Sequence, residues 1–599
     1  MRLAAVCTAL SLLGLIWIGV PWLLAVMTPD GELSGRAVDA LWVLQAAASF
    51  LVVAAVVLRS AGGVSHHTSW WLEPCSLTLE WRRLIVTGCL LGALAGSLLF
   101  LRPPVDDAFI SYRYAANAAQ GKGLVFNEHE RVEGYSNLLW ILLLAALMRA
   151  GSDPVVTSQV IGIAGACGAI GVAAAYLVGA DRSPLERAGA LSLMLMNVDF
   201  YSWASGGLET SLHALLITGA VIAMLRHKEA AVSLLLALAV LNRTDAVVTA
   251  VLLLALLIRE KSSSWRLAVA PALAVAGHGL FSLMYYGAVL PNPFYAKLSG
   301  GLWRLLLGVA YLADCWRDSV IGPAAAVFLA IGLFVCVKKA AHLGDARREL
   351  PAMIGVVTLE TVYVVLSGGD WMPACRRFQA ISPVVALLGG QVLVEVVRWC
   401  RARRSALLRW MIRVMGLVLL GVVGTRFGTA VIGTAVRFEP AMVLHSVYDE
   451  EVDWIVKHVD SSDVLAAENI GRLGYYSGAV MIDPLGLIDT RIARLPGLLH
   501  DKTDVTYVLA RRPDWITLNL ELYENGRIRG HTGFSEQMRG NEGFLDGYEL
   551  MARIKGWAIR NGWIYFHIYR ARSMREPGGA SDEMINEFHG AEKGGGYGF

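Results

Sequence analysis

The 599-residue sequence is poor in charged residues. Only 17% of its residues are Asp, Glu, Lys or Arg, whereas 56% are hydrophobic and the mean hydropathy is +0.52. Soluble globular domains carry about 25% charged residues. This composition excludes a soluble enzyme of ordinary type and is typical of a polytopic α-helical membrane protein, with the lipid bilayer as its surroundings.

The sequence also has no basic domain. Its 52 Lys and Arg residues nearly balance 49 Asp and Glu residues, for a net charge of +3, and they occur in short clusters between apolar runs. Nucleic acid is therefore not an expected partner.

Cysteine signatures are missing as well. The chain has eight cysteines, but it has no CxxC pair and no cysteine after Cys400. Neither a zinc site nor a disulfide framework is expected from this pattern.

The N-terminal apolar run lacks the features of a cleaved signal. It is longer than the ~7–15 residues of a signal-peptide core, and no A-x-A-like end follows it. We expect it to remain as the first membrane helix.

Apolar runs able to cross the ~30 Å hydrocarbon layer recur up to about residue 435 and indicate roughly 11 to 13 crossings. Arg and Lys collect on the cytoplasmic side of membrane proteins, so their clusters predict which ends are inside. Between residues 155 and 226, there is one apolar run too many or too few for successive helices to alternate strictly in direction. We expect a re-entrant or half-length segment around Ala188 to Gly207. The clusters lie at 82–83, 226–228, 259–266, 338–348 and 398–404.

Mixed polar sequence replaces the apolar runs after about residue 436. The stretch EEVDWIVKHV predicts an amphipathic helix, and PDWITLNL and GWIYFHIYRAR predict strands. We therefore predict three parts: a transmembrane module over 1–435 with a catalytic loop at 102–136, an external α/β domain over 436–575, and a disordered Gly-rich tail over 576–599.

An acidic pair opens the loop DDAFISYRYAANAAQGKGLVFNEHERVEGYSN. If a helix begins at Asp106, steps of about 100° per residue place Arg113 and Asn117 within roughly 20° of it, while Asp107 points elsewhere. One interpretation is that the pair caps a helix, since carboxylates are favoured at helix N-termini. The other is a reactive site, because NEHERVEGYSN, which includes Glu133, has more ionisable groups than a connector needs.

Further charges interrupt apolar sequence. Glu209 lies in SWASGGLETSLHALL, and Arg243 and Asp245 lie in LALAVLNRTDAVVTAVLLL. Ionisable groups at membrane depth are costly and face a cavity or a partner. They are therefore either a structural ion-pair set or the lining of a site.

The outer loop SGGDWMPACRR combines Asp370, the interfacial Trp371, and the paired Arg376 and Arg377. Arginines on the outer side are not explained by cytoplasmic retention, so they favour a phosphate partner. Lys297, which follows LPNPFYA, suits the same role.

Several blocks resemble those of GT-C membrane glycosyltransferases. The acidic loop, GGLETSLHALL, LPNPFYAKL, SGGDWMPACRRF, IGRLGYYSG and IDPLGLID are similar to the branch with bacterial arabinofuranosyltransferases, including a terminal enzyme of mycobacterial arabinan synthesis and a pilin arabinosyltransferase of Pseudomonas. The resemblance spans about residues 100–490. It implies a GT-C fold in the inner membrane with its active site in the periplasm. It also implies inverting transfer of D-arabinofuranose from a polyprenyl-phosphate donor to a cell-envelope glycan or pilin.

The resemblance also implies residue roles. Asp106 and Asp107 match the acidic pair that contains the general base, and the stripe shared with Arg113 favours Asp106. The basic positions are expected at the donor phosphate. No metal is expected, although paired acids can hold one. The candidate substrate-binding residues are Arg113, Asn117, Glu133, Tyr135, Glu209, Arg243, Asp245, Lys297, Asp370, Trp371, Arg376 and Arg377.

Other interpretations stay open at this point. The same chemistry with mannose or another pentose is the nearest. A transporter or flippase for a lipid-linked sugar would use Glu209, Arg243 and Asp245 along an alternating-access path. The hydropathy pattern shows no repeated half, which argues against it. A non-catalytic assembly subunit would tolerate Asn at Asp106 and Asp107.

Overall fold

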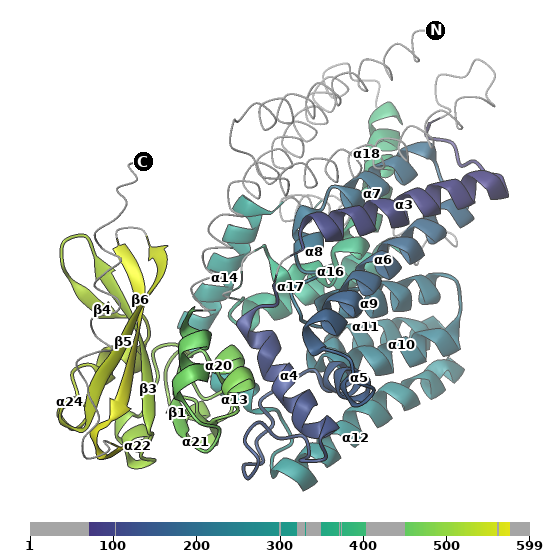
Figure 1. Ribbon diagram of the computed structural model, residues 1–599. Helices are drawn as coiled ribbons and strands as arrows, with labels where there is room; N and C mark the ends of the chain where they lie inside the picture. The colour runs from purple at the N-terminus through teal and green to yellow at the C-terminus, as the bar shows by residue number, and fades with distance from the viewer. Residues whose placement is uncertain are drawn as a thin grey trace.

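A computed structural model describes residues 71–101, 103–260, 262–298, 301–319, 330, 349–370, 372, 374–402, 450–559 and 562–574. The expected first helix, the boundary near residue 436, Trp371 and the tail over 576–599 lie outside the described residues. Figure 1 shows a helical part and, at the left, a C-terminal domain built on a β-sheet.

Within the described chain, five helices are long and apolar enough to cross a membrane, at Leu79–Leu99, Pro154–Gly179, Trp265–Tyr286, Glu349–Leu366 and Ser382–Trp399. The polytopic character that the composition predicts is supported to this extent. The α-helices of this part are α3 (Leu79–Leu99), α4 (Asp106–Ala119), α5 (Leu138–Arg149), α6 (Pro154–Gly179), α7 (Pro184–Leu195), α8 (Val198–Ser202), α9 (Thr210–Leu225), α10 (Glu229–Asn242), α11 (Val247–Glu260), α12 (Val269–Tyr286), α13 (Asn292–Leu298), α14 (Gly301–Asp318), α16 (Glu349–Leu366), α17 (Arg376–Gln379) and α18 (Ser382–Ala402).

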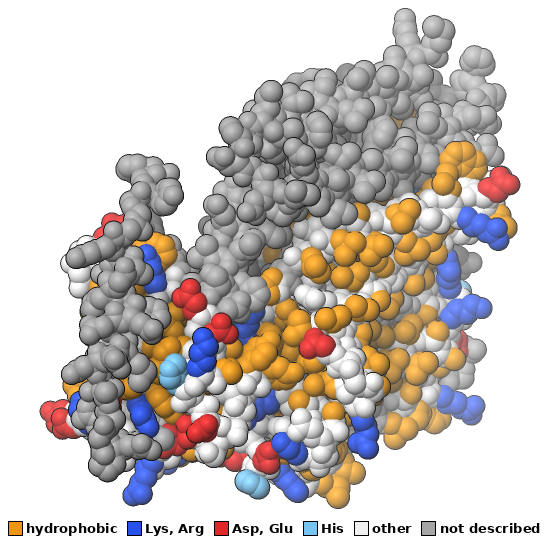
Figure 2. Space-filling view, in the orientation of Figure 1, with side chains coloured by type: hydrophobic (Ala, Val, Ile, Leu, Met, Phe, Trp, Pro, Cys, Tyr) orange, Lys and Arg blue, Asp and Glu red, His pale blue; other side chains and the backbone are white. Residues whose placement is uncertain are grey.

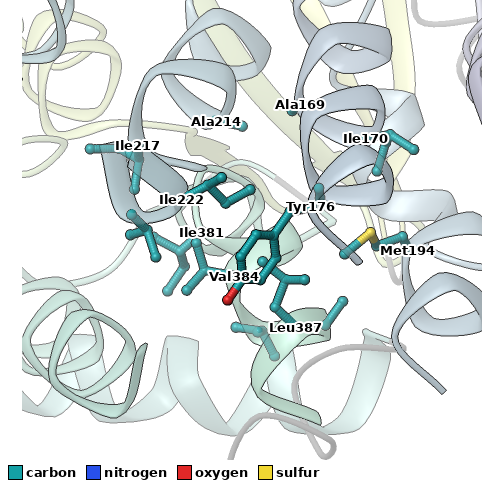
Figure 3. Close-up of a cluster of buried hydrophobic side chains, with 14 of the residues drawn as sticks. Ala169, Ile170, Tyr176, Met194, Ala214, Ile217, Ile222, Ile381, Val384 and Leu387 are labelled. Atoms are coloured by element: carbon teal, nitrogen blue, oxygen red, sulfur yellow. The ribbon is translucent and has the colours of Figure 1, made fainter. Parts of the chain in front are cut away.

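The helices pack through a continuous apolar core. Figure 3 shows Ile170 and Tyr176 of α6, Met194 of α7, Ile217 of α9 and Leu387 of α18 converging in one cluster. In lipid, helices associate through close packing of such side chains. The core therefore fixes the position of α9, whose N-cap residue is the predicted site residue Glu209.

The surface of the helical part is also apolar. Figure 2 shows hydrophobic side chains in a broad band across it, with charged side chains along the lower edge and the right margin. Leu273 and Leu280 of α12 are 66% and 58% exposed. A contiguous apolar surface of this kind requires a lipid or protein cover.

The helix ends separate into two faces. Helix α3 has Arg82 in its first turn and leads toward Asp106, whereas α9 begins after Glu209 and leads to Arg226. Arg82 and Arg226 thus lie at the helix ends away from Asp106 and Glu209. Which of these two ends is cytoplasmic stays a prediction from the positive clusters.

Two short helices occupy the stretch where the alternation was ambiguous. Helices α7 and α8 have 12 and 5 residues, too few for either to cross ~30 Å at 1.5 Å per residue. Before α7, Arg182 pairs with Glu349 at the start of α16, at 2.6 Å. After α8, the Trp203 ring lies 5.7 Å from the guanidinium of Arg376, in the outer loop. The stretch is therefore a broken pair of short helices, which is compatible with the expected re-entrant or half-length segment. Whether it crosses or returns stays a prediction.

The C-terminal domain combines parallel and antiparallel pairing. The strand order is β2-β1-β3-β6-β5, with β4 on β3; β1 pairs parallel with β2 and β3, and the other pairs are antiparallel. The predicted helix is confirmed at 450–458, and the predicted strands are confirmed as β3 and β6. The elements are β1 (Val464–Ala466), α20 (Ile470–Ser477), β2 (Val480–Ile482), α21 (Thr490–Ala493), α22 (Val505–Ala510), β3 (Trp515–Tyr523), β4 (Ile528–Gly530), α23 (Gly533–Met538), α24 (Glu542–Gly547), β5 (Tyr548–Ile559) and β6 (Gly562–Ala571).

One disulfide corrects the expectation drawn from the cysteines. Cys315 of α14 is bonded to Cys375, which directly precedes α17. The two cysteines are 60 residues apart in sequence, so no local spacing indicates the pair.

We expect this disulfide to be found in the protein isolated from its membrane. Alkylation under denaturing, non-reducing conditions should leave Cys315 and Cys375 unmodified and yield one linked peptide, because neither has a free thiol. Cys89, which is free and buried, is the internal control and should be alkylated. Peptide mapping by mass spectrometry checks this, and alkylation of both Cys315 and Cys375 before reduction would contradict it.

Candidate active site

The acidic pair begins a helix, as predicted, because α4 starts at Asp106. Helix α4 runs beside α20 of the C-terminal domain (Figure 1). Since successive helical residues are about 100° apart, Asp106 and Asp107 face different surroundings.

Asp106 caps the start of α20. Its Oδ2 accepts the backbone N–H of Gly471 at 3.1 Å, and its Oδ1 accepts that of Arg472 at 2.8 Å. The first N–H groups of a helix lack partners within the helix, and a carboxylate satisfies them. The approach is close, since a Cβ on Gly471 would lie 2.0 Å from the backbone oxygen of Asp106. Asp106 therefore joins the helical part to the C-terminal domain.

Arg113 and Asn117 share this face of α4, as predicted. Arg113 donates from Nε to the carbonyl of Phe126 at 2.8 Å and from NH2 to that of Ala479 at 2.7 Å. Asn117 donates to the carbonyls of Val125 and Phe126, at 2.8 and 3.0 Å. These donors hold the loop after α4 and the C-terminal domain. Their predicted contact with substrate stays a prediction, and the geometry favours a structural role.

Asp107 faces a different group of charges. It accepts no hydrogen bond from any residue that the structure describes, and it interacts electrostatically with Arg376, Lys297 and Asp370. Burial raises the pKa of Asp107 to about 6, because the loss of water outweighs the attraction of Arg376 and Lys297. A carboxyl group that titrates near neutral pH is suited to accept a proton during a reaction.

The predicted charges at membrane depth form one ion-pair network. Arg243 donates to Glu209 at 2.7 Å and to both oxygens of Asp245 at 2.7 and 3.0 Å. Arg377 approaches Asp245 at 3.3 Å. Asn137, which the sequence analysis did not single out, donates to Glu209 at 3.0 Å. In the sequence, its place in the polar stretch EGYSN was the only indication that Asn137 would contact a charged residue.

Arg376 and Asp370 form a second pair. The Nε and NH2 atoms of Arg376 both lie 2.8 Å from Oδ2 of Asp370. The turn before Arg376 is held in an unusual shape, because Ala374 and Cys375 have φ of 57° and 51°, in the left-handed region that non-glycine residues rarely adopt. The disulfide to Cys315 secures this turn.

Lys297 has no direct hydrogen-bond or ion-pair partner among the described residues. Its side chain is accessible, makes no hydrogen bond or ion pair with any described residue, and interacts with Asp370, Asp107, Arg376 and Arg377 through space.

Eight of the predicted charged residues thus gather in one set, four cationic and four anionic. Six of the eight bind one another directly. Asp107 and Lys297 are the two that have no direct partner within the described chain. The set is Asp107, Glu209, Arg243, Asp245, Lys297, Asp370, Arg376 and Arg377.

Glu133 and Tyr135 lie outside this set. Glu133 Oε1 is 2.8 Å from Nε2 of His278 in α12, and its Oε2 is buried without a partner in the described chain. The hydroxyl groups of Tyr135 and Tyr286 are 3.0 Å apart. Both residues connect the loop before α5 to α12, and neither bonds directly to the eight charges. Their predicted substrate role stays a prediction.

The described residues contain no group of three or more His, Cys, Asp and Glu side chains placed to hold a metal ion.

Comparison with known proteins assigns only the C-terminal part. A family described as a domain of unknown function (DUF8728) matches residues 441–574. A search of curated proteins finds no match.

The two acids should respond differently to replacement by Asn. Asp106→Asn places an amide N–H against an N–H of α20, and an unpaired buried donor costs about 1–3 kcal/mol, so the melting temperature should fall. Asp107→Asn should keep or raise it at pH 7.5. The raised pKa means that Asp107 stabilises the fold when protonated, below about pH 4, and that this contribution is lost as the pH rises through about 6.

Thermal unfolding of both variants from pH 4 to 8, followed by tryptophan fluorescence in detergent, checks this pair. The difference between wild type and Asp107→Asn should shrink toward pH 4. An equal loss of stability in both variants at pH 7.5 would contradict the different roles assigned to the two acids.

Proposed function

We propose that the protein is an inverting GT-C glycosyltransferase. It moves a sugar, D-arabinofuranose, from a polyprenyl-phosphate donor to a cell-envelope glycan or pilin on the periplasmic face of the inner membrane. The observation that carries the proposal is a pair of groups in the charged set that have no direct partner among the described residues: a carboxyl group of raised pKa, Asp107, and an ammonium group, Lys297.

The blocks that resemble this family meet in space, which supports the proposal. DDAF begins α4, GGLET precedes α9, LPNPFYAKL forms α13, GGDWMPACRRF leads into α17, and IGRLGYYSG forms α20. The charged set draws on the first four blocks, and the fifth is bound by Asp106. Residues more than 350 positions apart are thereby brought to one place.

The chemistry requires one base and one anion site. The acceptor hydroxyl attacks C1 of the donor sugar, the new O–C1 bond forms as the C1–O bond to phosphate breaks, and the hydroxyl proton passes to the carboxylate of Asp107. The polyprenyl phosphate leaves with the bonding electrons, and its charge is balanced by Lys297 and the neighbouring Arg376. Carboxylates nearby also favour the positive charge that develops on the sugar.

Asp107 is the better candidate for the base, against the preference that the helical stripe gave to Asp106. Both oxygens of Asp106 accept N–H groups of α20, so this carboxylate is occupied by the protein. The oxygens of Asp107 accept no hydrogen bond from the described residues.

Two independent observations support an external site. Disulfides persist in oxidising compartments such as the periplasm, and Cys375 directly precedes Arg376. The arginine clusters lie at the opposite helix ends, for example Arg82 in α3 and Arg226 after α9.

The alternative sugars remain within the same proposal, because mannose or another pentose would need the same base and anion site. A flippase is the alternative from another class. Against it, Glu209, Arg243 and Asp245 are joined in direct ion pairs at one end of α9 and α10, instead of being spread along a path.

Transfer should depend on Asp107 and Lys297. We expect purified wild type to transfer sugar from synthetic polyprenyl-phosphoryl-arabinofuranose to an arabinan-like or pilin-like acceptor, with and without chelator. Asp107→Asn should lower the rate by roughly 100-fold or more, the scale of general-base catalysis. Lys297→Met should strongly lower the rate at low donor concentration, whereas Arg539→Gln, a substitution at a partly exposed position of the C-terminal domain, should leave it unchanged.

Radiolabelled product formation measures these rates. Donor binding without transfer would support a GT-C glycosyltransferase but show that the tested sugar or the tested acceptor is not the natural one. Full activity of Asp107→Asn would exclude this residue as the base, and absence of both binding and transfer would favour the flippase or the assembly subunit.

The rate should also depend on pH through Asp107. A base must be deprotonated to act, and burial raises its pKa to about 6, so kcat/KM should rise between about pH 5 and 7 and then level off. Initial rates at low substrate across this range check the point, with donor stability controlled at each pH. A rate that is flat from pH 5 to 7 would argue against a proton transfer to this carboxyl group.

A further inference from the structure

Helix α13, which carries Lys297, is held mainly by the C-terminal domain. It has seven residues, and isolated helices of this length are not stable in water. The side chain of Asn292 at its start donates to the carbonyls of Gly486, Leu487 and Asp489, at 2.9, 3.1 and 3.1 Å. All three carbonyls belong to the loop between β2 and α21.

The middle and the end of α13 meet the same domain. The guanidinium of Arg494 lies 4.7 Å from the ring centre of Tyr295. The Nζ atom of Lys502 donates to the carbonyl of Ala296 at 2.7 Å, and to that of Ala493 at 2.7 Å. Lys502 therefore connects the residue next to Lys297 with the end of α21.

Lys502 is an unusual lysine. Only 4% of its surface is exposed, and burying an ammonium group is costly unless it is hydrogen-bonded. The last carbonyls of a helix lack partners within the helix and attract cations. Ala296 lies in the last turn of α13 and Ala493 is the last residue of α21, so one ammonium group serves two helix ends.

We propose that Lys502 is a positioning residue for the donor phosphate. By joining the ends of α13 and α21, it fixes α13 so that the ammonium group of Lys297 stays beside Asp107 and Arg376. Lys502 acts through Lys297 and does not touch the substrate. The identity of the ligand rests on the proposed function, whereas the coupling of Lys502 to α13 does not.

The coupling is tested first without any ligand. Hydrogen exchange of the full-length protein is compared for wild type, Lys502→Met and Lys502→Arg, with Arg539→Gln as the control because its ion pair with Glu536 is partly exposed. We expect exchange in α13 to be at least 10-fold faster in Lys502→Met, to be restored in part by Lys502→Arg, and to be unchanged in Arg539→Gln. Exchange in β3 shows whether the domain remains folded.

Two results of this measurement would overturn the proposal. The first is wild-type exchange in α13 of Lys502→Met. The second is fast exchange in β3 for both Lys502 variants, which would make Lys502 a general stabiliser of the domain.

Binding of undecaprenyl phosphate then tests the positioning role. Lys297→Met and Lys502→Met should each weaken binding about 10-fold, and the double variant should bind no more weakly than Lys297→Met alone, since Lys502 acts through Lys297. Additive losses would overturn the proposal by showing an independent effect. If coupling appears in exchange but the wild type does not bind this phosphate, the proposed function fails and the role of Lys502 in fixing α13 stands without a phosphate.

Discussion

The arrangement of the site depends first on one contact, in which the carboxylate of Asp106 meets the first N–H groups of α20. These N–H groups have no partner within their own helix, and the helix dipole favours a negative charge at this point. Asp106 supplies that charge from the first turn of another helix, in the other part of the chain. The same hydrogen bonds thus dock the C-terminal domain and orient α4. Because Asp107 is the next residue of α4, the contact that occupies one carboxylate also aims the other at the charged set.

The charged set itself follows from the cost of placing ions near apolar surroundings. A charge there is tolerated when an opposite charge or a hydrogen-bond donor lies beside it. Arg243 with its two carboxylates, and Arg376 with Asp370, satisfy this condition within the protein. Among the described residues, Asp107 and Lys297 have opposite charges near them but no direct partner. A ligand with a hydroxyl group and a phosphate would supply the missing partner to each, so binding and reaction would draw on the same unpaired charges.

Much of the fold follows from local patterns in the sequence, but the roles at the site do not. Apolar runs, the change after residue 436 and the helix beginning at Asp106 are local properties, and the structure agrees with them where it describes them. Helical periodicity correctly groups Asp106 with Arg113. It says nothing of what that face meets, which is a helix 365 positions away in sequence. For the same reason the sequence pattern favoured Asp106 as the base. Lys502 and the partner of Cys375 escaped notice because their contacts are also distant and no spacing rule applies to them.

The family match says little about activity because it covers the C-terminal domain, whereas the charged set lies in the helical part. The match covers residues 441–574, whereas all eight residues of the charged set lie before it. The helical part thus supplies the charges, and the C-terminal domain holds α4 through Asp106 and α13 through Asn292 and Lys502. Reacting groups must be placed to within a few tenths of an ångström, and a shift of about 1 Å is costly to the rate. A substitution in the helical part therefore changes which charges are present. On the proposed function, a substitution in the domain that loosens its hold on α4 or α13 would change the separation of Asp107 and Lys297 while leaving both charges in place.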